Sequence, residues 1–212
     1  MTRSIRRLLR LFGVAFVAVA PVVATTGAAH AQSAVTYNLQ SSALGQTANS
    51  TLSVQADGTA PASVAAGAPL SVALSVGSIT VPTSASGYTI KQIQNIVLKL
   101  PVPSNSTYVS SALSGGSGYG SGTPTVSVSS GVVSIRVPGP IAAGTTFTLP
   151  TLTLGLTAGA SGGSVVSTLS GTGYSDPGLT FTAVLSVFGF SVNANTVGYP
   201  TAQPALTSTT IS

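Results

Sequence analysis

The sequence predicts an all-β fold, an antiparallel two-sheet β-sandwich of the immunoglobulin-like type, preceded by a helical signal peptide. Two observations support this. Apolar and small polar residues alternate in segment after segment, as from Leu70 to Val76, which is the pattern of a strand with one buried and one solvated face. Turn sequences rich in Gly or Pro separate these segments at intervals of roughly a dozen residues, as in sandwiches.

Residues 1–31 have the features of a secretory signal peptide. A basic start with four arginines precedes an apolar stretch from Leu11 to Ala24, and Ala29 and Ala31 supply the small residues that signal peptidase requires at its cleavage site. The apolar stretch is shorter than the roughly 20 residues of a membrane-spanning helix. We therefore expect cleavage after Ala31 and a secreted, extracellular or cell-envelope location.

The remaining chain divides into a β-sandwich domain, residues 32–198, and a Pro/Thr/Ser-rich tail, residues 199–212, which we expect to be extended or loosely ordered. The predicted strands, in chain order, are 35–40, 52–56, 70–76, 96–100, 126–128, 133–137, 147–154, 165–169 and 179–192. Asp57-Gly58 is a turn pair that should end the second strand. Ser130-Gly131, between two alternating segments, predicts a hairpin.

One segment allows two interpretations. Ile90, Ile93, Val97 and Leu100 fall at helical spacing and permit a short helix. The β-branched content and the prolines on both sides favour a strand that begins irregularly.

The charge balance excludes nucleic-acid binding. After removal of the signal peptide, Lys91, Lys99 and Arg136 stand against Asp57 and Asp176, so the net charge is 3 − 2 = +1. A nucleic-acid-binding surface needs clustered cations that neutralise phosphates. Three scattered cations do not form such a cluster.

The same residue counts argue against catalysis. The chain has no cysteine, and its one histidine, His30, would leave with the signal peptide. General acid–base chemistry draws on His or on carboxylates with shifted pKa values, and zinc requires Cys or His ligands. Asp57 and Asp176 both stand in turn sequences. We therefore predict no catalytic residues, no cofactor and no metal site.

Two segments have alternative interpretations. Ser114 to Gly122 is a Gly/Ser run with Tyr119 near its centre; it is either a flexible hairpin tip or a mobile contact loop in which Tyr119 is the aromatic anchor. Leu179 to Val192 is the most apolar stretch after the signal peptide. It is either a central core strand or an exposed apolar surface for a lipid or a partner.

Several short sequence segments, taken together, resemble those of a family of secreted actinobacterial proteins. These segments are Val81-Pro82, residues 86–89, 96–103, 139–141, 146–150 and 174–181. The resemblance implies a β-sandwich of unknown function, in a family sometimes labelled automatically as cyclase or dehydratase; the residues quoted contain no chemistry that supports such a label. The resemblance also implies one cysteine near Tyr37 and another before Tyr199-Pro200. This chain has neither cysteine, so its first and last strands would be joined by strand pairing without a disulfide bond.

We therefore expect a non-catalytic protein with a structural or binding role. A nearly uncharged Ser/Thr surface suits contact with a neutral cell-envelope polysaccharide or a lipid. The alternative is a β-barrel or amphiphilic protein of a mycolate-type outer membrane. Against the barrel, most of the predicted strands are shorter than the roughly 9–11 residues needed to span, and aromatic girdles are missing.

Overall fold

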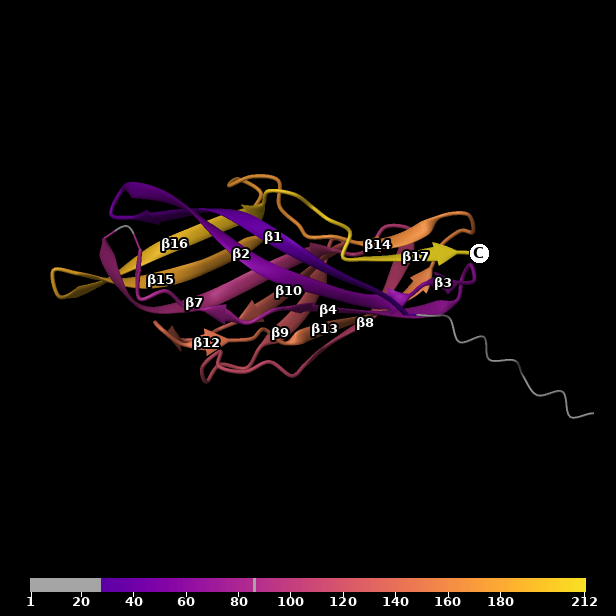
Figure 1. The fold of residues 1–212 in the computed structure, drawn as a ribbon, viewed down its shortest axis with the longest axis horizontal. Helices are drawn as coiled ribbons and strands as arrows, with labels where there is room; N and C mark the ends of the chain where they lie inside the picture. The colour runs from indigo at the N-terminus through magenta and orange to yellow at the C-terminus, as the bar shows by residue number, and fades with distance from the viewer. Residues whose placement is uncertain (1–27, 86) are drawn as a thin grey trace, which may run out of the picture.

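The computed structural model describes residues 28–85 and 87–212, and every regular element in that part of the chain is a β-strand. All but one of the strand pairings there are antiparallel, which confirms the all-β, antiparallel prediction. Figure 1 shows that the longest strands run along the length of the molecule. Most of the predicted signal peptide, residues 1–27, lies outside the described residues.

Most strands join in one large, nearly closed sheet. Its order is β8 (Ser106–Ser114), β13 (Thr151–Ala158), β4 (Pro69–Val76), β2 (Gln46–Pro61), β1 (Ala28–Ala43), β16 (Phe190–Pro200), β15 (Leu179–Val187), β7 (Tyr88–Pro101), β10 (Val132–Val137) and β9 (Thr125–Ser129), with β6 (Ser84–Ala85) and β11 (Ile141–Ala142) added beside β7. The two ends of this sheet, β8 and β9, contact each other. Its opposite sides therefore face one another as the layers of a sandwich do, but within one sheet.

Long strands allow one sheet to curl in this way. β1 and β2 have 16 residues each, β7 has 14, β16 has 11, and β8 and β15 have nine each. The expectation of strands shorter than about nine residues was therefore wrong for these six. β2 pairs with β1 along its whole length but with β4 only over 56–59. β7 pairs with β15 over residues 89–98 along one edge and with β10 over residues 96–101 along the other. Because β-strands twist along their length, such long strands carry the sheet from one layer to the other.

The predicted turn at Asp57-Gly58 is instead the middle of a strand. Asp57 pairs with Gln32 on one side and with Ser75 on the other. Gly58 is needed for a different reason, because a Cβ there would collide with the carbonyl oxygen of Leu206. The glycine thus permits a close backbone approach rather than a turn.

Two other local predictions are confirmed. Residues 90–100 belong to strand β7 and not to a helix. Ser130 and Gly131 form the two-residue loop between β9 and β10, with φ of 49° and 76°. Two consecutive residues with positive φ are the mark of a type I′ hairpin turn.

The C-terminal segment is more ordered than a loose tail. Residues 199–200 end β16, and β17 (Thr207–Ile211) lies between β14 (Ser164–Ser167) and β3 (Ser63–Val64) in a three-stranded sheet. Its buried hydroxyls have partners: Thr207 donates to Ser167 Oγ at 2.8 Å and Thr209 to the Pro61 carbonyl at 2.7 Å. The packed domain therefore continues past residue 198. A further small sheet joins β12 (Thr146–Phe147) to β5 (Ile79–Thr80).

The first and last long strands lie side by side. In the β1–β16 pair, Asn38 stands opposite Tyr199, and the Asn38 amide donates to the Tyr199 hydroxyl at 3.2 Å. These two strands contain the positions at which the family resemblance implies cysteines. In this chain, backbone pairing joins the two strands at these positions.

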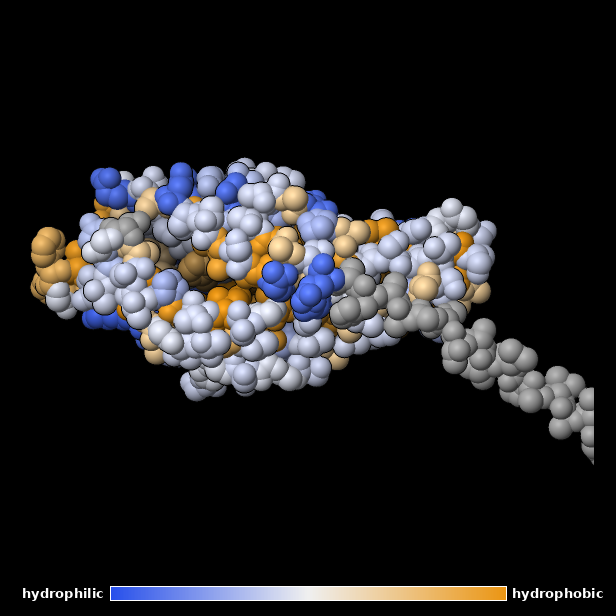
Figure 2. Space-filling model, viewed as in Figure 1, coloured by the Kyte–Doolittle hydropathy of each residue, from blue (hydrophilic) through white to orange (hydrophobic). Residues whose placement is uncertain are grey.

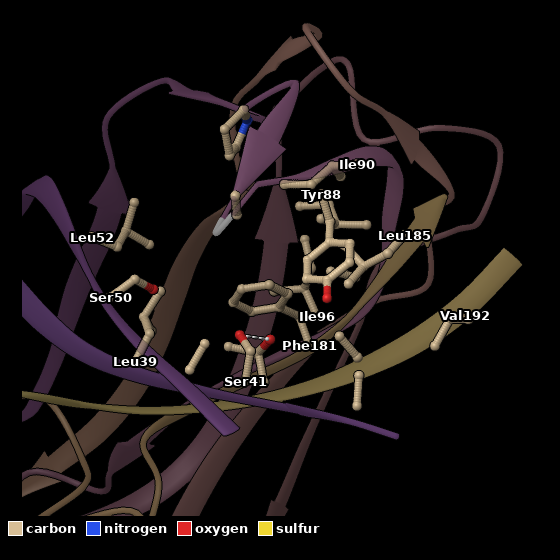
Figure 3. Close-up of a pocket in the computed structure, with 18 of the residues that line it drawn as sticks. Leu39, Ser41, Ser50, Leu52, Tyr88, Ile90, Ile96, Phe181, Leu185 and Val192 are labelled. Atoms are coloured by element: carbon tan, nitrogen blue, oxygen red, sulfur yellow. Dashed lines mark hydrogen bonds between the residues drawn. The ribbon is translucent and has the colours of Figure 1, made fainter. Parts of the chain in front are cut away.

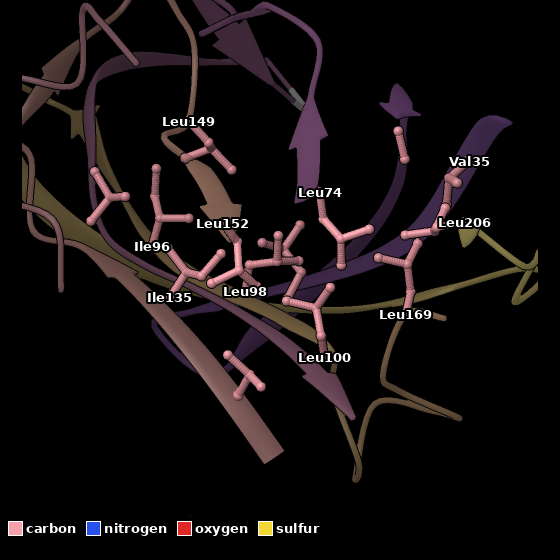
Figure 4. Close-up of a cluster of buried hydrophobic side chains, with 14 of the residues drawn as sticks. Val35, Leu74, Ile96, Leu98, Leu100, Ile135, Leu149, Leu152, Leu169 and Leu206 are labelled. Carbon is pink, nitrogen blue, oxygen red and sulfur yellow. The ribbon is translucent and has the colours of Figure 1, made fainter. Parts of the chain in front are cut away.

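One half of the molecule, which we call the closed half, has a filled core. It is centred on Leu74, Leu98, Leu100 and Leu152, which are 0–6% exposed and interdigitate across the curled sheet in Figure 4. The void among these side chains measures only about 20 Å³. The closed half therefore satisfies the close packing expected of a protein core.

Candidate functional site

The other half, which we call the open half, contains a cavity of about 650 Å³ between the facing sides of the sheet. Its walls are mainly apolar, and Leu39, Ile90, Ile96, Phe181 and Leu185 lie around it in Figure 3. Figure 2 shows apolar side chains inside a hollow on the face toward the viewer. Among the residues that the structure describes, no Lys, Arg, Asp or Glu lines this cavity.

Small side chains at inward positions create the space. Along β1 the inward residues are large at Tyr37 and Leu39 but small at Ser41 and Ala43. Ala183 on β15 and Ala194 on β16 are also inward, with 7% and 3% exposure, and line the same cavity. Because the side chains at these inward positions are short, the space between the facing sides of the sheet is not filled.

A gap in strand pairing opens the cavity to the outside. Over residues 46–54, β1 is the only described strand that pairs with β2, because pairing with β4 begins at Ala56. This stretch of β2 contributes Gln46, Thr47 and Ser50 to the cavity lining. The mouth is therefore rimmed by uncharged polar side chains along an unpaired strand edge.

Two hydroxyl groups form a polar point on the apolar wall. Ser41 Oγ and Thr196 Oγ1 lie 2.8 Å apart, shown by the dashed line in Figure 3, and both residues line the cavity. Within the pair one hydroxyl donates to the other, so one proton and several lone pairs remain for other partners. The pair can hydrogen-bond a hydroxyl or an ester carbonyl without placing a charge in the cavity.

The apolar stretch 179–192 divides into a buried and an exposed part. Leu179 and Ala183 on β15 are buried, as a core strand predicts. Phe188 and Phe190, at the end of the β15–β16 hairpin, are 97% and 74% exposed. The core-strand interpretation is therefore confirmed for the buried part, and a role of the exposed part in contact with a lipid or a partner stays a prediction.

Tyr119 takes no part in the cavity. The Gly/Ser segment around it is not a hairpin tip, because β8 pairs with β13 and β9 pairs with β10. It crosses between the two ends of the sheet and is fastened by two backbone hydrogen bonds between Ser117 and Thr148, of 2.8 and 3.0 Å. Tyr119 is half-buried against the core. Its role as a contact residue stays a prediction.

The two aspartates lie apart from the cavity lining. Asp176 occupies the predicted turn, where Thr172 Oγ1 donates to Asp176 Oδ2 at 3.0 Å. Asp57 lies within β2, and its Oδ1 is buried without a hydrogen-bond partner. In the described part of the chain, no group of three or more His, Cys, Asp or Glu side chains comes together.

The predicted cleavage residues lie at the start of β1. The backbone of Ala29 pairs with Ala60, and that of Ala31 pairs with Gly58. Cleavage after Ala31 would leave Gln32, opposite Asp57, as the first residue of this strand. Neither the cleavage itself nor export is tested by the structure.

Sequence reasoning missed the residues that form the cavity. Ser41, Ala183 and Ala194 carry no motif, and their common feature is a small side chain at an inward strand position. That signal is present in the alternation pattern. It becomes informative only when the strand order shows that the three positions surround one space.

Comparison with known proteins shows a similar fold and no family. No protein-family model matches the chain, and no curated protein matches it. A solved structure of a protein from Corynebacterium diphtheriae, described as membrane anchored, is similar in fold: the TM-score is 0.53 and the identity 18%. The match covers 87% of this chain and 38% of that one. Within the described residues of the present chain, there is no helix with the length and apolar character to cross a membrane.

Proposed function

We propose that this protein is a non-catalytic binding protein of the cell envelope that holds an uncharged apolar ligand, the acyl chain of a neutral lipid, in its cavity. The observation that carries the proposal is the cavity itself, with about 650 Å³ of space and mainly apolar walls. This volume is within the range of about 300–1,000 Å³ that small-molecule sites occupy.

The lining favours a neutral ligand. Burial of an ionised group without a partner costs far more than burial of an alkyl chain, and the described cavity residues include no charged side chain. The Ser41–Thr196 hydroxyl pair offers hydrogen bonds to a polar atom such as an ester carbonyl. We expect the chain of the ligand to fill the apolar space and its uncharged polar group to reach these hydroxyls.

The same lining favours a lipid over a polysaccharide. A sugar exposes many hydroxyl groups, each of which needs a hydrogen-bond partner when it is buried. The walls around Leu39, Ile96 and Phe181 offer apolar surface instead. A polysaccharide would therefore contact the outer surface of the protein and not these apolar walls.

Location in the envelope is supported by two facts of different kinds. The N-terminal sequence has the features of an export signal, and the protein of similar fold from C. diphtheriae is described as membrane anchored. The long strands β1 and β2 carry Ser, Thr, Asn and Gln at their exposed positions, for example Ser42, Asn49 and Ser53. A strand face that contacts lipid tails is apolar, so these faces favour a protein that meets lipid elsewhere.

Titration with N-phenyl-1-naphthylamine, an uncharged dye that fluoresces in apolar surroundings, tests the proposal. We expect saturable binding with one site per chain, displaced by a long-chain alcohol. Replacement of Ala183 and Ala194 by Phe should fill the cavity and weaken dye binding at least tenfold.

A matched control uses the other face of the same strand. Asn193 on β16 is exposed, so Asn193→Phe adds the same ring outside the cavity and should leave dye binding unchanged. Binding that is equally strong in the Ala183→Phe/Ala194→Phe variant, with the fold retained by circular dichroism, would refute a role for the cavity.

A further inference from the structure

We propose that the open end of the molecule docks on the surface of a lipid bilayer through the tips of two hairpins. The first tip is Leu44, between β1 and β2, and the second is formed by Phe188 and Phe190, between β15 and β16. This goes beyond the proposed function, because docking does not require that the cavity hold a ligand.

The tips expose apolar side chains to an unusual extent. Leu44 is 74% exposed, Phe188 97% and Phe190 74%. β1 and β16 are neighbours in the sheet, with Ser42 opposite Asn195, so the two tips project from the same end. In Figure 1 both hairpin ends lie at the left, and the end of the β15–β16 hairpin is apolar in Figure 2.

Folding does not demand these residues at these positions. Leu44 has φ of 50° and is followed by Gly45 at 75°, and Phe188 has φ of 48° and is followed by Gly189 at 84°. Each pair forms a complete two-residue hairpin loop. The first position of such a turn favours Asn, Asp or Gly, whereas Leu and Phe are strained at positive φ. Their presence calls for an explanation other than the turn.

The opposite end of the molecule provides an internal comparison. Ser130-Gly131 forms the same kind of turn, with φ of 49° and 76°. It lies beside Pro101, at the far end of β7 from Tyr88. A short polar residue occupies the first position there. Among these three turns, large apolar residues therefore occur at the end of the molecule that contains the cavity and not at the other end.

A lipid surface suits the tips better than a protein partner does. The apolar side chains stand on separate protrusions and form no continuous face, whereas protein interfaces depend on closely fitting surfaces. The interfacial region of a bilayer accepts individual Leu and Phe side chains, with cations at the level of the headgroups. Lys91 provides such a cation, since its Nζ lies 2.9 Å from Ser191 Oγ, next to Phe190.

The cavity lies directly behind these tips. Leu44, Tyr88 and Val187 belong to its lining, and Tyr88 is 48% exposed at the rim. A molecule docked by Leu44 and Phe188 would therefore hold this part of the cavity lining close to the lipid surface.

The chain has no tryptophan, so a single introduced tryptophan reports on one position. With the exported form of the protein and phosphatidylcholine vesicles, the emission of a Phe188→Trp variant should shift to shorter wavelength and be quenched by brominated lipid. The emission of Ser130→Trp, the matched control in the other turn, should not change. An unchanged Phe188→Trp spectrum, or equal shifts for both variants, would overturn the proposal.

Sedimentation with the same vesicles tests the tips together. Leu44→Asn, Phe188→Asn and Phe190→Thr should in combination weaken vesicle binding at least tenfold, while the Asn substitutions suit the left-handed turn positions and preserve the fold. Binding by the unmodified protein should persist at 0.5 M salt. Equal binding by the triple variant, no binding by the unmodified protein, or loss of binding in salt would each contradict apolar docking.

The proposal that the cavity binds a ligand and the proposal that the tips dock on a bilayer can be refuted independently of each other. The Ala183→Phe/Ala194→Phe variant should lose dye binding and still sediment with vesicles. If it loses both, docking depends on the cavity ligand and the proposed independent role of the tips is wrong. If a Phe188→Asn/Phe190→Thr variant, whose two positions lie outside the cavity lining, loses vesicle binding and keeps dye binding, the tips act as proposed.

Discussion

The closed and open halves of this molecule share long strands with the same alternation, yet one half is filled and the other is hollow. Around Leu98 and Leu152 the residual void is about 20 Å³, whereas around Ile90 and Phe181 the cavity measures about 650 Å³. β1 and β7 run through both halves. Strand geometry alone therefore does not decide where the cavity lies.

Two local features account for the difference. At the open end the inward residues of three neighbouring strands become small, at Ser41, Ala183 and Ala194. At the same end β2 has β1 as its only described partner over residues 46–54. In the closed half, β4 pairs with β2, and inward residues such as Leu74, Leu98 and Leu152 are large. A few smaller side chains and one missing pairing thus leave a cavity where a core would otherwise lie.

Truncation of a leucine should have the largest effect and should separate the halves. Leu152 is fully buried in the closed half, so Leu152→Ala should lower the free energy of unfolding by about 2–5 kcal/mol. Leu185 is half-buried beside the cavity and already lacks part of its packing, so Leu185→Ala should have at most half that effect. Urea unfolding measures both. Equal losses would show that the two halves are packed alike.

Enlargement of an alanine should have opposite effects in the two halves. Ala56 is 2% exposed in the closed half, and Ala56→Leu should destabilise by about 1–3 kcal/mol through overpacking. Ala194→Leu extends into the cavity, where room exists, and should leave stability unchanged or raise it while weakening dye binding. The comparison fails if Ala194→Leu destabilises as much as Ala56→Leu does.

A smaller effect concerns the pH dependence of stability. Tyr37 is buried on β1, and loss of solvation raises its pKa well above the usual value of about 10. The unfolded chain therefore releases this proton first as the pH rises. The free energy of unfolding should be insensitive to Tyr37 below about pH 9 and should fall above about pH 10.

A Tyr37→Phe variant isolates this contribution. Its unfolding free energy, measured by urea titration from pH 8 to 11, should fall less steeply above pH 10 than that of the unmodified protein. Parallel curves for the two proteins would show that Tyr37 is as accessible to water in the folded state as in the unfolded state.

The strands could be predicted from the sequence because alternation is a local property. Segments such as 70–76 and 133–137 carry it unambiguously, and the structure has strands there. The predicted turn at Asp57-Gly58 was wrong because a glycine next to an aspartate is typical of turns. The actual requirement, room for the Leu206 carbonyl, comes from a residue almost 150 positions away.

The cavity and the exposed tips depend on the global arrangement. Ala183 and Ala194 are directly paired on adjacent strands, but Ser41 reaches them only through the β1–β16 register. Phe188 and Phe190 lie in a sequence that predicts a core strand, and only the hairpin at Phe188-Gly189 places them outside. The alternation pattern in a sequence indicates on which face of a strand a side chain lies, but not whether another side chain packs against it.

The central claim, that the open half holds one neutral lipid, is tested most directly by native mass spectrometry of the exported protein mixed with a monoacylglycerol. The account predicts a single one-to-one adduct for the unmodified protein and for Asn193→Phe. It predicts loss of the adduct in the Ala183→Phe/Ala194→Phe variant. No adduct for the unmodified protein, or an equal adduct in the cavity-filled variant, would contradict the account.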